Sequence, residues 1–353
     1  MAATVAAQAG AHVVLFEAGG WLGGRLGLQT QPLQGPRSIF SDATGVDFCE
    51  RLADDARRSG VDIRPNTPVH GICRHADGFA ISLQDGDGPS AIKAKGLILA
   101  TGSVEPPGEF VGSSRQGVML SGDAQERLVL HSEIPGQRAV MAGSDNAGLL
   151  IAQALRKAGM EVVAVVEPAR RVVGREFNAA PLRDAGVEIL TSADILEAIG
   201  QDRVEAVKVM ELSDEGQPVA NRQGRFELDT ICLALPRTPR TALADELGCP
   251  ALEMRALGGI TPLHTGKMAT PVPGLYVAGD VAGVENGAVA LESGRLAGLG
   301  LSQELGYRHP DTAAHVSLAR GRLGYLRRGA RGLLKRKAKS AIASECGRMT
   351  ISR

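Results

Sequence analysis

One pattern occurs twice in this chain: an alanine-rich helix ends at a glycine, and a short apolar strand follows and ends in an acidic residue. The first copy ends its helix at Gly10 and its strand at Glu17. The second copy ends its helix at Gly159, 149 residues after Gly10, and its strand at Glu167. Repeated strand and helix units of this kind predict parallel sheets covered by helices, so the expected fold class is α/β.

The second copy contains a glycine-rich turn, residues 143–148, between a strand and a helix. In a dinucleotide-binding unit such a turn lets backbone amides approach a pyrophosphate, and the acid ending the next strand accepts hydrogen bonds from a ribose diol. The predicted contacts here are Gly143, Asn146, Gly148 and Glu167. The counterpart of Gly143 in the first copy would fall at position −6, so we expect nucleotide binding there to depend on an N-terminal extension.

The inner turn departs from the Gly-x-Gly-x-x-Gly pattern because Asp145 stands where the second glycine is expected. Its charge is expected to repel phosphate by about 1–4 kcal/mol at about 4 Å, which leaves NAD(P) binding open. Alternatively, Asp145 contacts a ribose hydroxyl or caps the following helix. If the turn binds, Glu167 favours NAD, whereas Arg170 and Arg171 would accept a 2′-phosphate.

A third motif, residues 273–280, has the pattern of a buried strand entered through Pro-Gly and ended by Gly-Asp. A carboxylate at that strand end can hold a sugar or ribityl hydroxyl. Another buried strand ends at residues 101–102. The four glycines of residues 19–24 either let the backbone pass close to a flat ligand or belong to a mobile surface loop. The predicted contacts in this unit are Glu17, Gly24, Arg25, Thr101, Gly102, Gly279 and Asp280.

In this order the motifs resemble the two-dinucleotide-domain flavoproteins of the pyridine nucleotide-disulfide oxidoreductase superfamily, over roughly residues 1–300. Residues 117–125, 257–264 and 268–274 resemble one subgroup, the α subunits of the hydrogen cyanide synthase, opine oxidase and proline or hydroxyproline dehydrogenase group. The resemblance implies two nested Rossmann-like FAD/NAD(P)-binding domains with small antiparallel β meanders. It also implies FAD as a cofactor, with NAD(P) as a second one left open.

The resemblance further implies a division of the chain and a function. Residues 1–108 and 231–305 would form the FAD-binding-type domain, residues 109–230 the NAD(P)-binding-type domain, and residues 306–353 a basic tail. The protein would be an FAD/NAD(P)-dependent oxidoreductase subunit that transfers hydride or electrons between a nicotinamide or partner flavin and FAD. Its setting would be a hetero-oligomeric amino-acid or opine dehydrogenase complex with a second flavin subunit. The alternative is a degenerate scaffold subunit that binds no FAD by itself.

The cysteines argue against dithiol chemistry. All five are scattered, without a C-x-x-C pair, which predicts reduced thiols in a cytoplasmic protein. Relatives of the subgroup often continue into a cysteine-rich iron–sulfur segment, but Cys346 stands alone and cannot supply four ligands. We read it as a surface cysteine and expect no metal site. No side chain is identified as a catalytic acid or base.

Charge is unevenly distributed, although the net charge is zero. Residues 307–353 carry twelve Lys/Arg and two Asp/Glu. Residues 327–339 have helical spacing, with Leu326, Leu333 and Leu334 as a narrow apolar edge. A solvated helix, a partner-docking segment and a membrane-surface segment remain open, whereas nucleic acid is not expected because stacking aromatics are missing. No apolar run reaches the roughly 18–20 residues of a membrane span, and the N-terminus lacks the basic region of a signal peptide.

Overall fold

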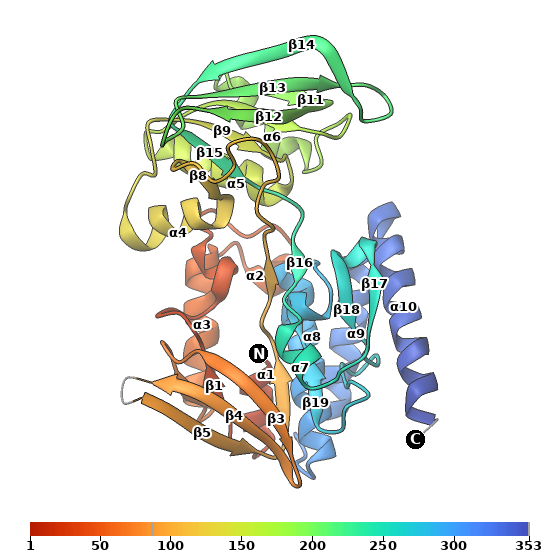
Figure 1. Ribbon diagram of the computed structural model, residues 1–353. Helices are drawn as coiled ribbons and strands as arrows, with labels where there is room; N and C mark the ends of the chain where they lie inside the picture. The colour runs from red at the N-terminus through yellow and green to blue at the C-terminus, as the bar shows by residue number, and fades with distance from the viewer. Residues whose placement is uncertain (86–87, 352–353) are drawn as a thin grey trace. The chain divides into compact units, whose positions relative to one another are not determined.

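The computed structural model describes residues 1–85 and 88–351 of the chain. The chain forms two units, residues 1–104 with 237–353 and residues 105–236. Figure 1 labels most of their helices and strands. Among the described residues, no helix is both long enough and apolar enough to cross a membrane.

The unit of residues 105–236 is built on a five-stranded parallel sheet in the order β11-β10-β9-β15-β8. Its strands are β8 (Val118–Leu120), β9 (Arg138–Ala142), β10 (Glu161–Glu167), β11 (Glu188–Thr191) and β15 (Thr230–Leu233). The central strands are almost continuously apolar because both faces of the sheet are covered. Successive residues of β9 point to opposite faces, so Val140 and Met141 enter different core clusters.

Helices cover one face of this sheet and a second sheet covers the other. The helices are α4 (Ser121–His131), α5 (Asn146–Lys157) and α6 (Glu176–Asp184). The covering sheet is antiparallel and contains β12 (Ala193–Ile199), β13 (Ala206–Leu212) and β14 (Pro218–Glu227). Leu149 and Leu182 pack on the helical side, and Ile195 and Val207 on the other.

The other unit contains two parallel strand pairs. β1 (Val14–Phe16) pairs with β2 (Asp62–Arg64), and β6 (Leu97–Leu99) pairs with β19 (Leu275–Val277). The helices packed on them are α1 (Ala2–Gln8), α3 (Gly45–Arg58) and α8 (Gly287–Glu304). Helices α1 and α8 approach closely because Gly298 has no side chain; a Cβ there would lie 2.4 Å from the Ala2 carbonyl oxygen.

Small antiparallel elements complete this unit. The predicted meander is present as β3 (Val69–His75), β4 (Gly78–Asp85) and β5 (Gly88–Ala94). Residues 86–87, between β4 and β5, lie outside the described residues. The remaining strands form the pairs β7 (Ser103–Val104) with β16 (Thr238–Pro239) and β17 (Ala251–Met254) with β18 (Gly259–Pro262). The short helices are α2 (Arg37–Phe40), α7 (Ala242–Glu246), η1 (Gly24–Leu28), η2 (Arg255–Leu257) and η3 (Gly279–Ala282).

Two further helices end the chain, α9 (Thr312–Leu326) and α10 (Gly329–Ile351). In Figure 1, α10 runs alongside the β17–β18 hairpin, and its apolar side chains bury themselves against the residues next to that hairpin. The buried face consists of Ala338, Ile342 and Cys346. The C-terminal segment is therefore a packed part of its unit.

The predicted α/β class, with Rossmann-like sheets and antiparallel meanders, is confirmed. Several details differ from the sequence predictions. The strand after residue 230 belongs to the sheet of residues 105–236, because β15 pairs with β9 and β8. Strand β12 was not predicted. Leu333 and Leu334, the expected apolar edge of the tail, are exposed, and Cys346 is buried rather than on the surface. The reason is that α10 docks through a different face, the one that carries Ala338, Ile342 and Cys346.

Candidate functional site

The strand ends of β6 and β19 meet at one edge, as the carboxyl ends of parallel strands must. The amide of Ala278 donates to the Leu99 carbonyl at 2.9 Å, which continues the pairing beyond β19. Gly279 then adopts a φ of +71°, and its amide donates to the Ser293 hydroxyl of α8 at 3.0 Å. This turn places Asp280 at the open edge, between the strand pair and helix α8.

The Asp280 carboxylate is held from three directions. One oxygen accepts from the Ser103 hydroxyl at 3.0 Å and pairs with the Arg237 guanidinium at 3.3 Å. The other accepts from the amide of Glu285 at 3.2 Å. The Asp280 side chain remains 18% exposed. A carboxylate that is oriented by the protein but still reachable can accept a further hydrogen bond from a ligand hydroxyl.

Ser103 and Arg237 were missed by the sequence analysis. Ser103 directly follows the predicted Thr101-Gly102 motif, so its position next to a strand end was an available signal. Arg237 lies far from Asp280 in sequence, and no local pattern indicates their pairing.

The predicted pair Thr101 and Gly102 lies directly before Ser103 and faces the backbone of Arg240. The Thr101 hydroxyl donates to the Arg240 carbonyl at 2.8 Å, and the Arg240 amide donates to the Gly102 carbonyl at 3.0 Å. Gly102 has a φ of +76°, and a Cβ there would meet nothing within 4 Å. Thr101 therefore fixes the local backbone, and Gly102 leaves open space beside the strand edge.

Glu17, Gly24 and Arg25 follow β1 of the separate pair β1–β2 and precede β2. One oxygen of Glu17 accepts from the amide of Gly19 at 3.0 Å, and the side chain is half-buried. Gly24 and Arg25 begin η1, whose Leu26 side chain packs on Gly287 at the start of α8. These residues are thus connected to the Asp280 region through the first turn of α8.

The glycine-rich turn of residues 143–148 is sterically demanding. Gly143 has a φ of +103°, and a Cβ there would lie 2.2 Å from the Ala234 carbonyl oxygen. Gly148 is similarly close, because its Cβ would lie 2.7 Å from that of Ala234. Both glycines therefore have a packing reason to be glycine that does not require a ligand.

Asp145 takes one of the alternatives that the sequence left open: it is the N-cap of α5. Its carboxylate accepts from the amide of Gly148 at 2.8 Å. The side chain satisfies one of the unpaired amides of the first turn, which is the usual role of an aspartate at this position. The Asp145 carboxylate is therefore bound to a backbone amide of α5. The expectation that it simply repels phosphate did not take this hydrogen bond into account.

Glu167 and Asn146 also have protein partners. Glu167 is buried, and one of its oxygens accepts from the amide and hydroxyl of Ser144 at 2.9 and 2.6 Å. Its other oxygen accepts from the amide of Ala169 at 2.8 Å. The Asn146 side-chain oxygen accepts from the Arg175 amide and the Asn178 side chain. A ribose diol at Glu167 would have to share or displace the Ser144 hydroxyl, so the role of Glu167 in NAD binding stays a prediction.

The thiols are poorly suited to redox catalysis. All five cysteines are free. Burial raises the pKa of Cys49 and Cys249 to about 11, and that of Cys232 to about 12. Because the thiolate is the reactive form, these three thiols are inert near neutral pH.

A group of metal-ligand side chains lies before and within the first turn of α9. Ligand atoms of His309, Asp311 and His315 lie within 4.8 Å of one another. However, the Arg295 guanidinium lies 3.3 Å from Nδ1 of His315, and its positive charge would repel a metal ion bound at this cluster. We therefore assign no metal to this cluster.

Comparisons with known proteins agree with this architecture. Hydrogen cyanide synthase subunit HcnB of Pseudomonas protegens is 27% identical over 335 residues, which cover 88% of this chain and 70% of that protein. An opine oxidase subunit of Rhizobium meliloti is 26% identical over 361 residues, which cover 96% of this chain and 65% of that protein. The chain thus spans about two thirds of the length of these two relatives.

Solved structures show the same fold. Thioredoxin reductase of T. acidophilum superposes with a TM-score of 0.70 at 22% identity, covering 86% of this chain and 94% of that one. L-Proline dehydrogenase from P. horikoshii superposes with a TM-score of 0.68 at 20% identity, covering 91% of this chain and 56% of that one.

The model of the family "pyridine nucleotide-disulphide oxidoreductase" matches residues 1–294, and its members are FAD- and NAD(P)-dependent oxidoreductases. The predicted superfamily is thereby confirmed, and this chain belongs to the pyridine nucleotide-disulphide oxidoreductase family.

Proposed function

We propose that this chain is the FAD-binding subunit of an amino-acid or opine dehydrogenase assembly. It would transfer hydride or electrons between FAD and either a nicotinamide or the flavin of a second subunit. FAD supplies the redox chemistry when bound, and the protein supplies binding and orientation. Both similar relatives, from hydrogen cyanide synthase and from opine oxidase, are named as subunits, which supports the multi-subunit setting.

The observation that carries the proposal is the Asp280 carboxylate. It is oriented by Ser103, Arg237 and the Glu285 amide, and it lies at the carboxyl edge of parallel strands. That edge is where ligands bind in open α/β sheets. In this proposal, Asp280 accepts a hydrogen bond from a hydroxyl of the ribityl chain. Glu17, with only one oxygen used by Gly19, serves the adenosine ribose.

In this proposal, the unit of residues 105–236 is the NAD(P)-binding-type domain of the chain. Its phosphate turn is closely packed, and the carboxylate of Glu167 is already hydrogen-bonded on both oxygens. These contacts favour a partner flavin over a nicotinamide bound in this chain as the electron donor or acceptor. Disulfide reduction is disfavoured because the cysteines are buried or isolated from one another in sequence. The free thiols also support the predicted cytoplasmic location.

The test is flavin binding. Purified chain is titrated with FAD and measured by visible absorbance, both as these 353 residues and with an N-terminal extension that supplies a strand and glycine-rich turn. We expect Asp280→Asn to weaken FAD binding by about 10- to 100-fold, the effect of losing one hydrogen bond to a charged group. Asp54→Asn, an exposed substitution on α3, is the matched control.

The rival function is a scaffold subunit that binds no FAD. It predicts no stoichiometric flavin in either form of the chain, and no effect of Asp280→Asn on assembly with a partner. Flavin bound equally well by wild type and Asp280→Asn would instead show that the site lies elsewhere.

A further inference from the structure

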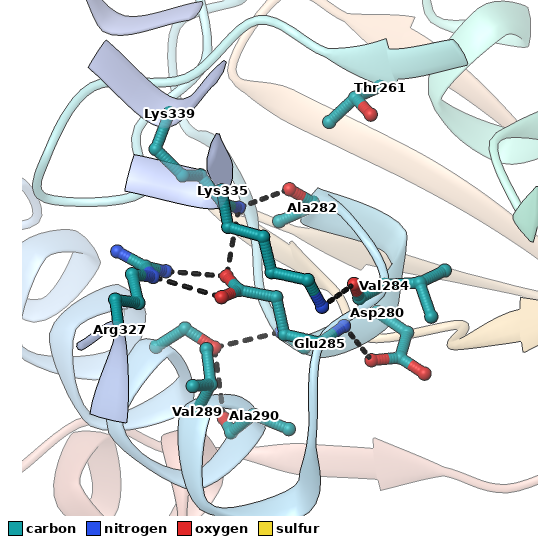
Figure 2. A network of polar contacts seen from close by, with 12 residues as sticks. Thr261, Asp280, Ala282, Val284, Glu285, Val289, Ala290, Arg327, Lys335 and Lys339 are labelled. Carbon is teal, nitrogen blue, oxygen red and sulfur yellow. Dashed lines mark hydrogen bonds and ion pairs between the residues drawn. The ribbon is translucent and has the colours of Figure 1, made fainter. Parts of the chain in front are cut away.

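The C-terminal helix α10 packs beside the proposed flavin site. Ala338, Ile342 and Cys346 occupy successive turns of one face and contact Leu257 and Leu263, both of which are almost fully buried. The Cys346 thiol also approaches the Ala269 carbonyl, at 3.9 Å. This apolar contact fixes the rotation of α10 about its axis. Lys335 and Lys339, one turn apart, therefore project toward the loop that follows Asp280 (Figure 2).

That loop, residues 282–286, accepts hydrogen bonds from both lysines. The Lys335 amine donates to the Val284 carbonyl at 2.9 Å, and the Lys339 amine donates to the Ala282 carbonyl. The backbone amides of this loop have other partners: the Gly283 amide donates to the Asp280 carbonyl and the Val284 amide to the Leu257 carbonyl. The Glu285 amide is the one that reaches the Asp280 carboxylate.

Glu285 connects the helix to the site. Its side chain is 3% exposed, and its two oxygens accept from the Arg327 guanidinium at 3.0 and 2.6 Å. Lys339 lies 4.0 Å from the same carboxylate. The side chain of Glu285 is therefore anchored to the C-terminal helices, while its backbone amide holds Asp280 (Figure 2).

Asn286, the residue after Glu285, links the same loop to helix α8. The Asn286 side chain caps α8 by accepting from the amide of Val289 at 3.0 Å. Displacement of Glu285 would thus disturb both the Asp280 carboxylate and the first turn of α8. A buried carboxylate that loses its cationic partners cannot stay in place, because an unpaired charge is strongly disfavoured in the interior.

We propose that Glu285 is a positioning residue for the flavin, clamped by Arg327 and Lys339, while Lys335 holds the adjacent Val284 carbonyl, so that the C-terminal helices are part of the flavin site. The inference rests on the proposed function, in which Asp280 binds FAD. Docking of α10 then fixes loop 282–286, and the loop fixes the carboxylate that receives the cofactor. None of these four side chains is proposed to contact the reacting atoms.

The experiment separates positioning from stability by comparing two ways of disturbing α10. Glu285→Gln and Lys335→Met alter the clamp, whereas Ile342→Ala weakens the apolar docking without touching the loop. Lys337→Met is the control, because Lys337 lies on the exposed side of the same helix. Each variant is measured for its dissociation constant for FAD, the visible spectrum of bound flavin and its melting temperature, using the full chain with the N-terminal extension of the binding test.

We expect Glu285→Gln and Lys335→Met to weaken FAD binding by about 10-fold or more at a temperature where all variants are folded, and to shift the flavin bands toward those of free FAD. Ile342→Ala should lower the melting temperature more than it lowers FAD affinity, and Lys337→Met should change neither.

Two outcomes would overturn the inference. FAD affinity within about twofold of wild type in Lys335→Met and Glu285→Gln would show that the loop does not depend on the clamp. If Glu285→Gln does not fold, Lys335→Met decides alone, since its half-buried side chain makes only one hydrogen bond to the loop. If the loss of FAD affinity is proportional to the drop in melting temperature in all variants, Ile342→Ala included, then the clamp only stabilises the fold and does not position the flavin. Absence of FAD binding by wild type would instead refute the proposed function itself.

Discussion

Acid should destabilise this protein through one buried histidine. His264 is 3% exposed and follows β18, with its Nδ1 2.8 Å from the Pro262 carbonyl oxygen. Since a carbonyl can only accept, Nδ1 carries the hydrogen. Nε2 then faces the Lys339 amine at 3.3 Å with its lone pair. Burial, and the nearby positive charge of Lys339, lower the pKa of His264 to about 3.

The sign and size of the effect follow from this shift. An unfolded histidine titrates near pH 6.5, so the unfolded chain takes up the proton first as the pH falls. The folded state is then progressively disfavoured between pH 6.5 and the folded pKa of about 3. Each pH unit below 6.5 costs about 1.4 kcal/mol, which amounts to about 2 kcal/mol at pH 5.

The assay is urea unfolding at a series of pH values from 8 to 5. His264→Asn retains a donor for the Pro262 carbonyl but cannot titrate, so its free energy of unfolding should lose about 2 kcal/mol less than that of wild type over this range. His12→Asn, an exposed substitution, should behave as wild type does. Parallel losses in wild type and His264→Asn would refute the reasoning, because the proton uptake would then belong to other groups.

Three more predictions use the same unfolding measurement. Asp145→Ala removes the acceptor for the Gly148 amide and should lower the free energy of unfolding by about 1 kcal/mol, whereas Asp145→Asn keeps an acceptor and should lower it less. Equal stability of Asp145→Ala and wild type would contradict the capping role. Ile342→Ala should lower the free energy of unfolding by about 2–5 kcal/mol, because it leaves a cavity under α10. Leu334→Ala, at a side chain that is 58% exposed, should change it by no more than about 0.5 kcal/mol. Similar losses in the two variants would mean that α10 is not docked. Burial lowers the pKa of Lys339 to about 8, so as the pH rises the folded chain releases this proton before the unfolded chain does. The free energy of unfolding of wild type should therefore rise by up to about 3 kcal/mol relative to that of Lys339→Met between pH 8 and about 10.5. No relative rise would show that the amine is solvated.

The sequence by itself determined the fold class and the placement of most strand ends. Alternation of short apolar strands, glycine turns and amphipathic helices is a local property, because it reflects which backbone conformations and which faces each segment can adopt. Gly143 and Asp280 were therefore locatable from their position between a strand and a helix. The two alternatives for Asp145 were also local, and the structure selected capping because the Gly148 amide lies within hydrogen-bond distance.

Only the tertiary structure decided what these residues contact. Arg237 reaches Asp280, and Arg327 reaches Glu285, across long stretches of chain, and a sequence pattern carries no information about which distant charge completes a pair. The same holds for α10, where Leu333 and Leu334 are the adjacent leucines that the sequence singled out, but Ala338 and Ile342 are buried. The buried face of a helix is set by the shape and spacing of the surface it docks on, and here that surface lies next to the loop that holds Asp280.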